Sequence, residues 1–290
     1  MRFARLGPIG AEIPAIVTPN GTFDLSELTP DIDGRFFAEG GIERSRELLD
    51  AEMLPLLEGA DALRRGAPLG RPSAVVCIGM NYSAHARESG AEPPATPIIF
   101  FKPPNTVVGP DDDFVLPPGS TNTDWEVELG IVIRSRALYL ADPADAMRHI
   151  AGFVVANDIS EREHQLELSG GQWSKGKAGP GFTPIGPWLV TSDEVNPADV
   201  RLRSWVNGEI RQDSSTADQI FGVDYLVFHL SQYMALEPGD LILTGTPEGV
   251  ALAGRFPYLG DGDVVEVEIE DMGRQTQRVH SRSKETANVR

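Results

Sequence analysis

The sequence predicts a β-rich fold of the α+β class with a domain boundary near residue 70. From Ser73 onward, short apolar runs are separated by Gly and Pro, which is typical of many short strands rather than of a doubly wound sheet. In RLRSWVNGEIRQ, Asn207-Gly208 lies between alternating segments and predicts a hairpin with a type I′ turn. A cluster of Gly and Pro over 66–72 separates residues 1–70 from this β-rich part.

Apolar periodicity places the expected elements along the chain. Strand-like pieces are expected within 2–17, and longer strands at 74–79, 98–101, 125–133, 153–157, 240–244 and 264–269. Helical patterns lie at 43–57, 143–150 and 223–234, with shorter helices expected around 83–88 and after Asp158. Residues after 274 are polar and are expected to form a frayed tail. The domains predicted are therefore 1–70, 71–275 and a tail, 276–290.

Composition and charge exclude several classes of protein. The chain has 290 residues and a formal net charge of −18, and it has no basic cluster, so binding to nucleic acid is not expected. No apolar stretch approaches the ~20 residues of a membrane span, and the N-terminus lacks the apolar core of a signal peptide. The single cysteine, Cys77, cannot form an internal disulfide. These observations predict a cytoplasmic protein.

The segment DWEVELGIVI carries two carboxylates, Glu126 and Glu128, on an expected strand. Strand alternation sends both side chains to one face, where like charges repel unless a cation neutralises them. A solvated strand face is an equally good interpretation of this pair alone. Asp158 ends the apolar run GFVVAND and either caps the next helix or completes a site of three oxygens. Without a nearby His or Cys ligand, such a site favours Mg²⁺ or Mn²⁺ over Zn²⁺.

A possible general base lies in NYSAHARES, where His85 and Glu88 are three residues apart and share one face of a short helix. A carboxylate beside an imidazole orients the ring and raises its basicity, as a base toward water requires. A surface His–Glu pair of little consequence is the alternative interpretation.

Polar and positive groups are spread where an acidic substrate would need them. Lys102 follows the run PIIFF, Arg162 and Gln165 follow Asp158, and Lys177 lies in SKGKAGPGF. Taken singly, each is typical of a solvated surface residue.

The loop TGTPEGV places Thr246 just after an apolar strand, where its hydroxyl and the neighbouring N–H groups could hold a carboxylate. A structural turn is the simpler interpretation of this loop alone. The sequence has no Gly-x-Ser-x-Gly elbow, phosphate-binding GxxxxGK[ST] loop, HExxH or strand-borne GxGxxG, so serine hydrolase and nucleotide-binding functions lack support.

Several motifs in order resemble the fumarylacetoacetate hydrolase superfamily over about residues 73–273. These motifs are GMNYSAHARESG, PIIFFKP, DWEVELGIVI, GFVVANDIS, QWSKGK, FTPIGPW, VNGE, LEPGDLILTGTPEGV and LGDGDVVEVEIEDMG. The resemblance implies a mixed β-sandwich roll with a small N-terminal domain, assembled as a homodimer. Two segments depart from the family pattern: the chain reads GKAGPGF where members often read GKS-x-D-x-F, and Glu161-Arg162-Glu163 where members often read ARD.

The resemblance also implies roles for the residues singled out above. It implies that Glu126, Glu128 and Asp158 bind Mg²⁺ or Mn²⁺, that His85 with Glu88 activates water, that Lys177 contacts the substrate oxyanion, and that Lys102, Arg162, Gln165 and Thr246 line the substrate site. The substrate expected is a small 2-oxo acid.

The reaction expected is hydrolysis of a C–C bond in a 2,4-dioxo acid, an acylpyruvate or a sugar-acid-derived diketo acid, through a metal-bound enolate. Family members with the same parts also isomerise hydroxymuconate-type diacids or decarboxylate oxaloacetate. A metal-dependent isomerase or decarboxylase is therefore the second hypothesis, and a binding protein that has lost catalysis is the third.

Overall fold

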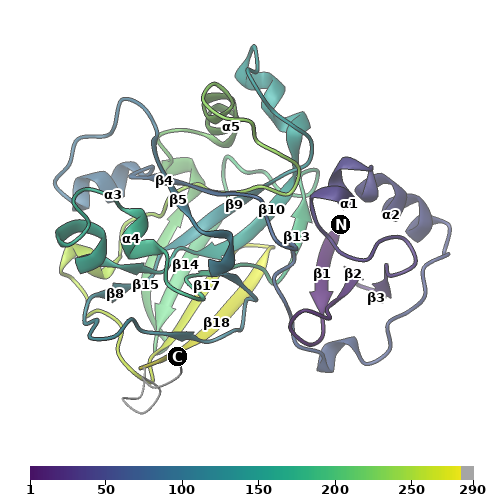
Figure 1. Ribbon diagram of the computed structural model, residues 1–290, viewed down its shortest axis with the longest axis horizontal. Coiled ribbons are helices and arrows are strands. Elements are labelled where there is room, and N and C mark those ends of the chain that lie inside the picture. The colour runs from purple at the N-terminus through teal and green to yellow at the C-terminus, as the bar shows by residue number, and fades with distance from the viewer. Residues whose placement is uncertain (282–290) are drawn as a thin grey trace.

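Two β-sheets pack face to face in the computed structural model, which describes residues 1–281 (Figure 1). The larger sheet runs in the order β3-β2-β1-β13-β10-β9-β16-β4-β5 and the smaller in the order β15-β14-β17-β18-β7. The larger sheet is built of β1 (Arg2–Leu6), β2 (Ile13–Thr18), β3 (Gly21–Asp24), β4 (Val75–Gly79), β5 (Ile98–Lys102), β9 (Val127–Ile133), β10 (Ile150–Asn157), β13 (Leu189–Thr191) and β16 (Leu241–Leu243). The smaller sheet is built of β7 (Phe114–Val115), β14 (Arg201–Val206), β15 (Glu209–Ser215), β17 (Val264–Ile269) and β18 (Gly273–His280).

Two short strand pairs and a set of short helices surround these sheets. The pairs are β8 (Thr123–Asp124) with β11 (Ser160–Glu161), and β6 (Val107–Val108) with β12 (Thr183–Pro184). The α-helices are α1 (Gly34–Ala38), α2 (Gly41–Asp50), α3 (Ser83–Glu88), α4 (Ser174–Lys177) and α5 (Val223–Ser231). The 3₁₀ turns are η1 (Ala60–Ala62), η2 (Pro104–Thr106), η3 (Pro143–His149), η5 (Thr216–Asp218) and η6 (Ala251–Ala253), and η4 (Glu163–Glu167) is a π-helix. None of the helices within residues 1–281 is long and apolar enough to cross a membrane.

The central strand β9 explains why the core has two layers. Its residues are buried throughout, and alternate side chains enter different clusters. Ile131 packs in the cluster shared with the smaller sheet, whereas Val132 packs with Phe36 and Ile42 on the opposite face. A strand covered on both faces is apolar at almost every position, so Glu128 within β9 and Glu126 just before it need a specific environment.

Most of the predicted elements are confirmed, including the β-rich α+β class. Asn207 and Gly208 join β14 to β15 with φ of 53° and 78°, as a type I′ turn requires. The helix predicted at 43–57 is too long, because α2 ends at Asp50 and Pro55 has no N–H with which to continue it. The helical pattern at 143–150 is the 3₁₀ turn η3, and β10 already begins at Ile150.

The predicted frayed tail is wrong for residues 275–280. These residues belong to β18, which lies between β17 and β7 in the smaller sheet, so a domain end at 275 would cut through a strand. The strand looks polar because two of its inward positions are glutamines. Gln275 is buried and donates to the carbonyl oxygens of Val155 at 2.7 Å and Gly186 at 2.9 Å. The rest of the predicted tail, from residue 282, lies outside the described residues.

The N-terminal segment continues the larger sheet. Arg2 and Phe3 of β1 pair with Val190 and Leu189 of β13, and β2 and β3 extend the sheet from there. In Figure 1 this purple segment forms one side of the molecule, with α1 and α2 beside β1–β3. The boundary near residue 70 stays a prediction, and the sheet crosses it.

Candidate active site

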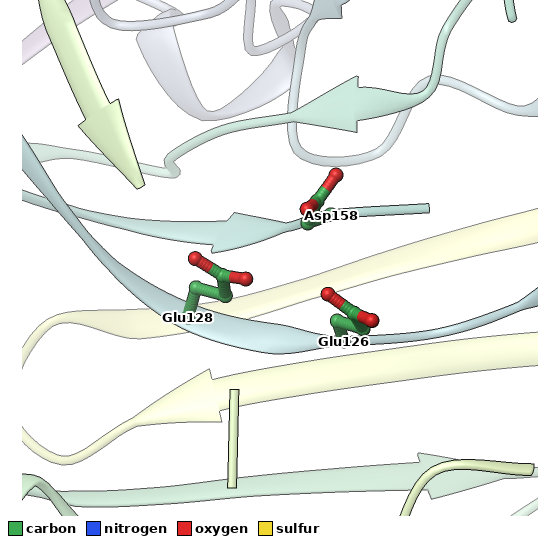
Figure 2. Close-up of side chains that lie close together, drawn as sticks. All are labelled: Glu126, Glu128 and Asp158. Carbon is green, nitrogen blue, oxygen red and sulfur yellow. The ribbon is translucent and has the colours of Figure 1, made fainter. Parts of the chain in front are cut away.

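Three carboxylates meet where β9 begins and β10 ends (Figure 2). Glu126 precedes β9, Glu128 lies within it, and Asp158 follows β10. The antiparallel pairing of β9 with β10 sets Asp158 beside Glu126, and the Asp158 N–H donates to the Glu126 carbonyl at 2.9 Å. One oxygen from each carboxylate lies within 4.8 Å of the others, and all three residues are buried.

Two lysines neutralise part of this negative charge. Lys177 Nζ donates to Glu126 Oε2 at 2.8 Å and to Asp158 Oδ2 at 2.6 Å, and it lies 4.9 Å from the centre of the Phe100 ring. Lys102 Nζ pairs with Asp158 Oδ1 and donates to the Phe182 carbonyl at 2.6 Å. Lys177 reaches these carboxylates from α4 although its loop departs from the family pattern.

The two glutamates have opposite electrostatic environments. Burial by itself raises the pKa of Glu126, but the Lys177 and Arg162 charges outweigh burial and hold that pKa well below its usual range. Burial raises the pKa of Glu128, and the negative charges of Asp158 and Glu126 raise it further, against the opposing effects of Lys177 and the Gly245 N–H. Glu128 is therefore the carboxyl group of the cluster whose charge the neighbouring cations do not neutralise.

These three carboxylates fit a hard divalent cation. They supply oxygen ligands only, which Mg²⁺ and Mn²⁺ prefer, and they converge closely enough to share one ion. The position of the Lys177 ammonium between Glu126 and Asp158 shows that this point attracts a cation. The raised pKa of Glu128 favours its neutral carboxyl form, and a bound divalent ion would favour the charged form instead.

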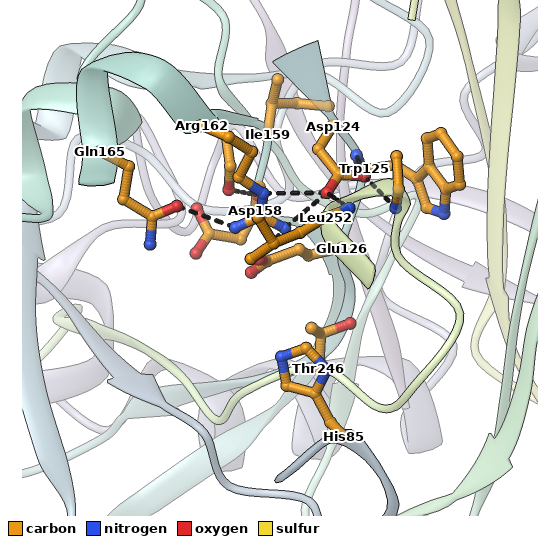
Figure 3. A network of polar contacts seen from close by, with 12 residues as sticks. His85, Asp124, Trp125, Glu126, Asp158, Ile159, Arg162, Gln165, Thr246 and Leu252 are labelled. Carbon is orange, nitrogen blue, oxygen red and sulfur yellow. Dashed lines mark hydrogen bonds and ion pairs between the residues drawn. The ribbon is translucent and has the colours of Figure 1, made fainter. Parts of the chain in front are cut away.

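Arg162 lies beside Asp124 and Glu126 (Figure 3). Its Nη2 lies 2.8 Å from Asp124 Oδ2 and 2.7 Å from Glu126 Oε1, and its Nη1 donates to Gln165 Oε1 at 2.9 Å. Burial lowers the pKa of Arg162, but the Asp124 and Glu126 charges raise it above its ordinary value, so the guanidinium stays charged.

His85 faces this cluster from α3. In Figure 3 it lies with Thr246 across an open space from Arg162 and Glu126. The residue is 6% exposed, and the ring Nδ1 has no hydrogen-bond partner among residues 1–281. Burial lowers the pKa of His85, and the Glu126 charge opposes that shift, so the neutral base form is favoured.

Glu88 lies close to His85 without bonding to it. The separation is 3.9 Å between Glu88 Oε2 and His85 Nδ1, too long for a hydrogen bond. Glu88 instead accepts from the Gly249 N–H at 2.9 Å and from Arg255 at 3.3 Å. The pair predicted from sequence is therefore brought together, with the carboxylate anchored to the loop after β16.

A cavity of about 130 Å³ is lined by His85 and by two of the three carboxylates, Glu126 and Glu128. Its walls contain most of the predicted site residues, namely His85, Glu126, Glu128, Arg162, Gln165, Lys177 and Thr246. Glu88, Asp158 and Lys102 are not among the lining residues. The Lys102 ammonium is turned toward Asp158 and two backbone carbonyls. Its position indicates a role in holding Asp158 rather than the direct substrate contact that was expected.

Backbone geometry shapes the cavity at two glycines. Gly245 has φ of +95° and its N–H donates to Glu128 Oε2 at 2.7 Å, a conformation that residues with a side chain rarely adopt. A Cβ on Gly79 would lie 2.3 Å from the Trp173 ring, so only glycine lets this tryptophan line the cavity.

Two buried positioning residues were not predicted from the sequence. Asp124 accepts from the N–H groups of Ala251 and Leu252 as well as from Arg162. Gln212 of the smaller sheet donates to Thr246 Oγ1 at 2.8 Å and accepts from the Val127 N–H at 3.1 Å. Asp124 opens the motif DWEVEL, which was the available signal, whereas nothing local in the sequence marks Gln212.

A second cavity, of about 860 Å³, lies beside α4 and is lined by loops near residues 113–118 and 178–182. It is larger than the first but contains none of the three clustered carboxylates. Volume alone is therefore a poor guide to the chemistry of this molecule.

Comparison with known proteins defines the class of protein. The family model described as fumarylacetoacetate (FAA) hydrolase C-terminal matches residues 74–280. The chain belongs to this family.

Three named proteins are similar to this chain in sequence or in structure. A 2,4-didehydro-3-deoxy-L-rhamnonate hydrolase of Sphingomonas sp. is 42% identical over 96% of both chains. The crystal structure of a 2-hydroxyhepta-2,4-diene-1,7-dioate isomerase from Mycobacterium marinum has a TM-score of 0.76 at 33% identity, over 98% of this chain and 100% of that one. A maleylpyruvate hydrolase from Sphingobium sp. SYK-6, solved with manganese(II) and pyruvate, has a TM-score of 0.79 at 26% identity with the same coverage.

Proposed function

We propose that this protein is a divalent-metal-dependent hydrolase that cleaves the C3–C4 bond of a 2,4-dioxo acid, either an acylpyruvate or a sugar-acid-derived diketo acid. The observation that carries this proposal is a cluster of three buried carboxylates, two of which, Glu126 and Glu128, line the same small cavity as His85, whose Nδ1 has no hydrogen-bond partner among residues 1–281. The names of the Sphingomonas and Sphingobium relatives support a hydrolase of this class.

Glu126, Glu128 and Asp158 would hold Mg²⁺ or Mn²⁺. When bound, the cation would supply Lewis-acid stabilisation of negative charge on the oxygens of a 2-oxo acid. Glu126 and Asp158 would then no longer need the Lys177 ammonium as their counter-charge. Lys177 is thereby free to contact a substrate oxygen, because it already lines the cavity.

His85 acts as the general base. The imidazole removes a proton from a water molecule, whose oxygen attacks the C4 carbonyl carbon of the substrate. Glu88, 3.9 Å from the ring, stabilises the imidazolium that results. Lys177 stabilises the negative charge that develops on the C4 oxygen.

The C3–C4 bond then breaks, and its electron pair passes to C3 to give the enolate of a pyruvate-type acid. His85 returns its proton to C3. The products are a pyruvate-type acid and a carboxylic acid, which together contain the atoms of the substrate and one water. Arg162 and Gln165 form the wall on the opposite side of the cavity and orient the substrate.

The direct test is an assay of acetylpyruvate with Mg²⁺ or Mn²⁺ supplied. We expect loss of the enol absorbance together with equimolar pyruvate and acetate. Chelation of the metal should abolish the reaction and re-addition should restore it. If acylpyruvates and sugar-acid-derived diketo acids are all left intact by the metal-loaded protein, the hydrolase proposal is wrong.

A second candidate function is isomerisation or decarboxylation of a 2-oxo diacid on the same residues. The 33% identity to an isomerase structure favours keeping it. These reactions need proton transfer at carbon but no attack by water, so they would release CO₂ or shift a diene absorbance without forming a carboxylic acid pair.

The protein is also expected to form a homodimer and to bind a small-molecule substrate. Sedimentation velocity at micromolar concentration tests the oligomeric state, because monomer and dimer of a 31.4 kDa chain are well separated in mass.

A further inference from the structure

The short helix α4 places two side chains in the wall of the small cavity. Trp173 is its N-cap and has helical backbone angles, and Lys177 is its last residue. Residues four apart lie on the same face of a helix, and both side chains line the cavity. One helical turn therefore carries an aromatic ring together with the ammonium that is expected to act on the C4 oxygen of the substrate.

A series of contacts leads from the carboxylates to this ring. Lys177 Nζ donates to Glu126 Oε2 at 2.8 Å and lies 4.9 Å from the centre of the Phe100 ring. The centre of the Phe100 ring lies 5.7 Å from that of the Trp173 ring. A substrate whose C4 oxygen contacts Lys177 therefore places the group attached to C4 beside these two rings.

The apolar part of the cavity wall is suited to the carbon atoms of a substrate, because contact with such a wall removes them from water. Trp173 has the largest side chain in it and so takes the most room. The apolar lining residues are Ile78, Met80, Phe100, Leu166, Trp173 and Leu252.

Trp173 is fixed between β4 and β5. A Cβ on Gly79 would lie 2.3 Å from the ring, so the ring lies directly on the backbone of β4. The next residue, Ser174, donates from its Oγ to the Phe101 carbonyl at 2.6 Å and ties α4 to β5. The Trp173 ring therefore has no room to move toward β4 when a longer substrate enters.

We propose that Trp173 is a specificity-determining residue that limits the length of the acyl group attached to C4, and that Gly79 sets how far its ring projects into the cavity. The inference rests on the proposed function and concerns the half of the substrate that leaves as the carboxylic acid. The limit is one of size and does not depend on the charge of that half.

A series of straight-chain acylpyruvates, from acetylpyruvate to hexanoylpyruvate, measures this limit. In wild type, kcat/KM should fall at least about tenfold at the chain length that meets Trp173. Trp173→Leu removes the ring but keeps an apolar wall, and it should raise the ratio of kcat/KM for hexanoylpyruvate to that for acetylpyruvate at least about tenfold. Trp205→Leu is the matched control, because Trp205 packs against Arg203 and Arg274 on the smaller sheet, and it should keep the wild-type ratio.

A methyl group at residue 79 tests the contact with the ring. Gly79→Ala should push the Trp173 ring into the cavity and lower the ratio of hexanoylpyruvate to acetylpyruvate use below that of wild type. In the double variant Gly79→Ala/Trp173→Leu the clash is absent, so the ratio should equal that of Trp173→Leu alone. If Gly79→Ala by itself does not fold, the double variant should fold. Additive effects, or a double variant that also fails to fold, would refute the role given to Gly79.

Binding separates failure of this inference from failure of the proposed function. The 2-oxo acids from 2-oxopentanoate to 2-oxooctanoate have no C4 carbonyl and cannot be hydrolysed. With Mn²⁺ supplied, calorimetry should show that Trp173→Leu lowers the dissociation constant of 2-oxooctanoate relative to that of 2-oxopentanoate at least about tenfold.

The two measurements have distinct outcomes. If this binding shift appears but no acylpyruvate or sugar-acid-derived diketo acid is cleaved, the hydrolase function fails and the role of Trp173 stands. If acylpyruvates are cleaved but Trp173→Leu keeps the wild-type ratio, the acyl chain lies elsewhere in the cavity and the inference is overturned. No cleavage together with an unchanged binding preference would overturn both.

Discussion

Glu126 and Glu128 lie two residues apart at the start of β9, yet the pKa values of their carboxyl groups shift in opposite directions. Glu126 contacts Arg162 at 2.7 Å and Lys177 at 2.8 Å, whereas Glu128 accepts a hydrogen bond from the Gly245 N–H. One carboxylate is thus neutralised by the protein, and the other is left for an external cation.

The first prediction contrasts these two glutamates in the metal-free protein. Glu126→Gln removes one of the two carboxylate partners of each of two buried cations, Arg162 and Lys177, and should lower the free energy of unfolding by about 3 kcal/mol. Glu128→Gln removes a carboxyl whose folded pKa is raised. Such a group binds its proton more tightly in the folded protein than in the unfolded chain, so its contribution to stability falls as pH rises above the pKa of the unfolded chain. At pH 7 the Glu128→Gln variant should therefore be at least as stable as wild type.

Urea unfolding of both variants in the presence of a chelator measures this contrast. Repeating it with Mn²⁺ should stabilise the wild type but neither variant, since each has lost one ligand. Equal destabilisation by the two substitutions would contradict the charge assignment.

The second prediction concerns Lys177 as a competitor of the metal. Lys177→Met removes the ammonium between Glu126 and Asp158, so Mn²⁺ should bind without displacing it. We expect a larger rise in melting temperature on adding Mn²⁺ than in wild type, but kcat lower by about 10²-fold or more. Lys175→Met is the control, because Lys175 donates only to the Ser169 carbonyl in the described structure. An unchanged response to Mn²⁺ in the Lys177 variant would refute competition.

The third prediction is a pH dependence set by His85. Burial lowers the pKa of His85, so the neutral base should persist below pH 6.5 and kcat/KM should fall only at more acidic pH. Glu88 raises that pKa, so Glu88→Gln should move the acid limb to still lower pH.

His85→Ala should lower kcat by roughly 10² to 10⁴-fold. Stopped-flow or steady-state pH profiles with Mn²⁺ saturating measure both effects, and an acid limb that survives His85→Ala would assign the base elsewhere.

The fourth prediction concerns Asp124, which ties Arg162 to the turn that carries Leu252. Asp124→Asn keeps the shape but removes the charge, and it should lower the free energy of unfolding by about 2 kcal/mol. Because Arg162 then has only Glu126 as a charged partner, we expect KM to rise more than kcat falls. Asp213→Asn is a suitable control, since Asp213 pairs with Arg201 at an exposed site. A variant with unchanged KM and reduced stability would limit Asp124 to a structural role.

Local sequence was sufficient for the elements that depend on local chemistry. The Asn207-Gly208 turn needs two positive φ angles and was predictable from those two residues. The strands β9 and β10 were predictable from the apolar runs LGIVI and GFVVA. The helix at 43–57 was overextended because periodicity continued past Pro55, and β18 was missed because its buried glutamines make the strand look polar.

The sequence by itself determined that two glutamates share a strand face, that an aspartate ends a second strand, and that a His–Glu pair shares a helix. Only the tertiary structure decided which charges meet. The pairing of β9 with β10 brings Asp158 to Glu126, α4 supplies Lys177 as the counter-ion, and the smaller sheet supplies Gln212. The physical reason is that the direction of each side chain along a strand or helix follows from local sequence, whereas neutralisation of a buried charge depends on partners far away in the chain. The domain boundary, the dimer and the cytoplasmic location stay predictions.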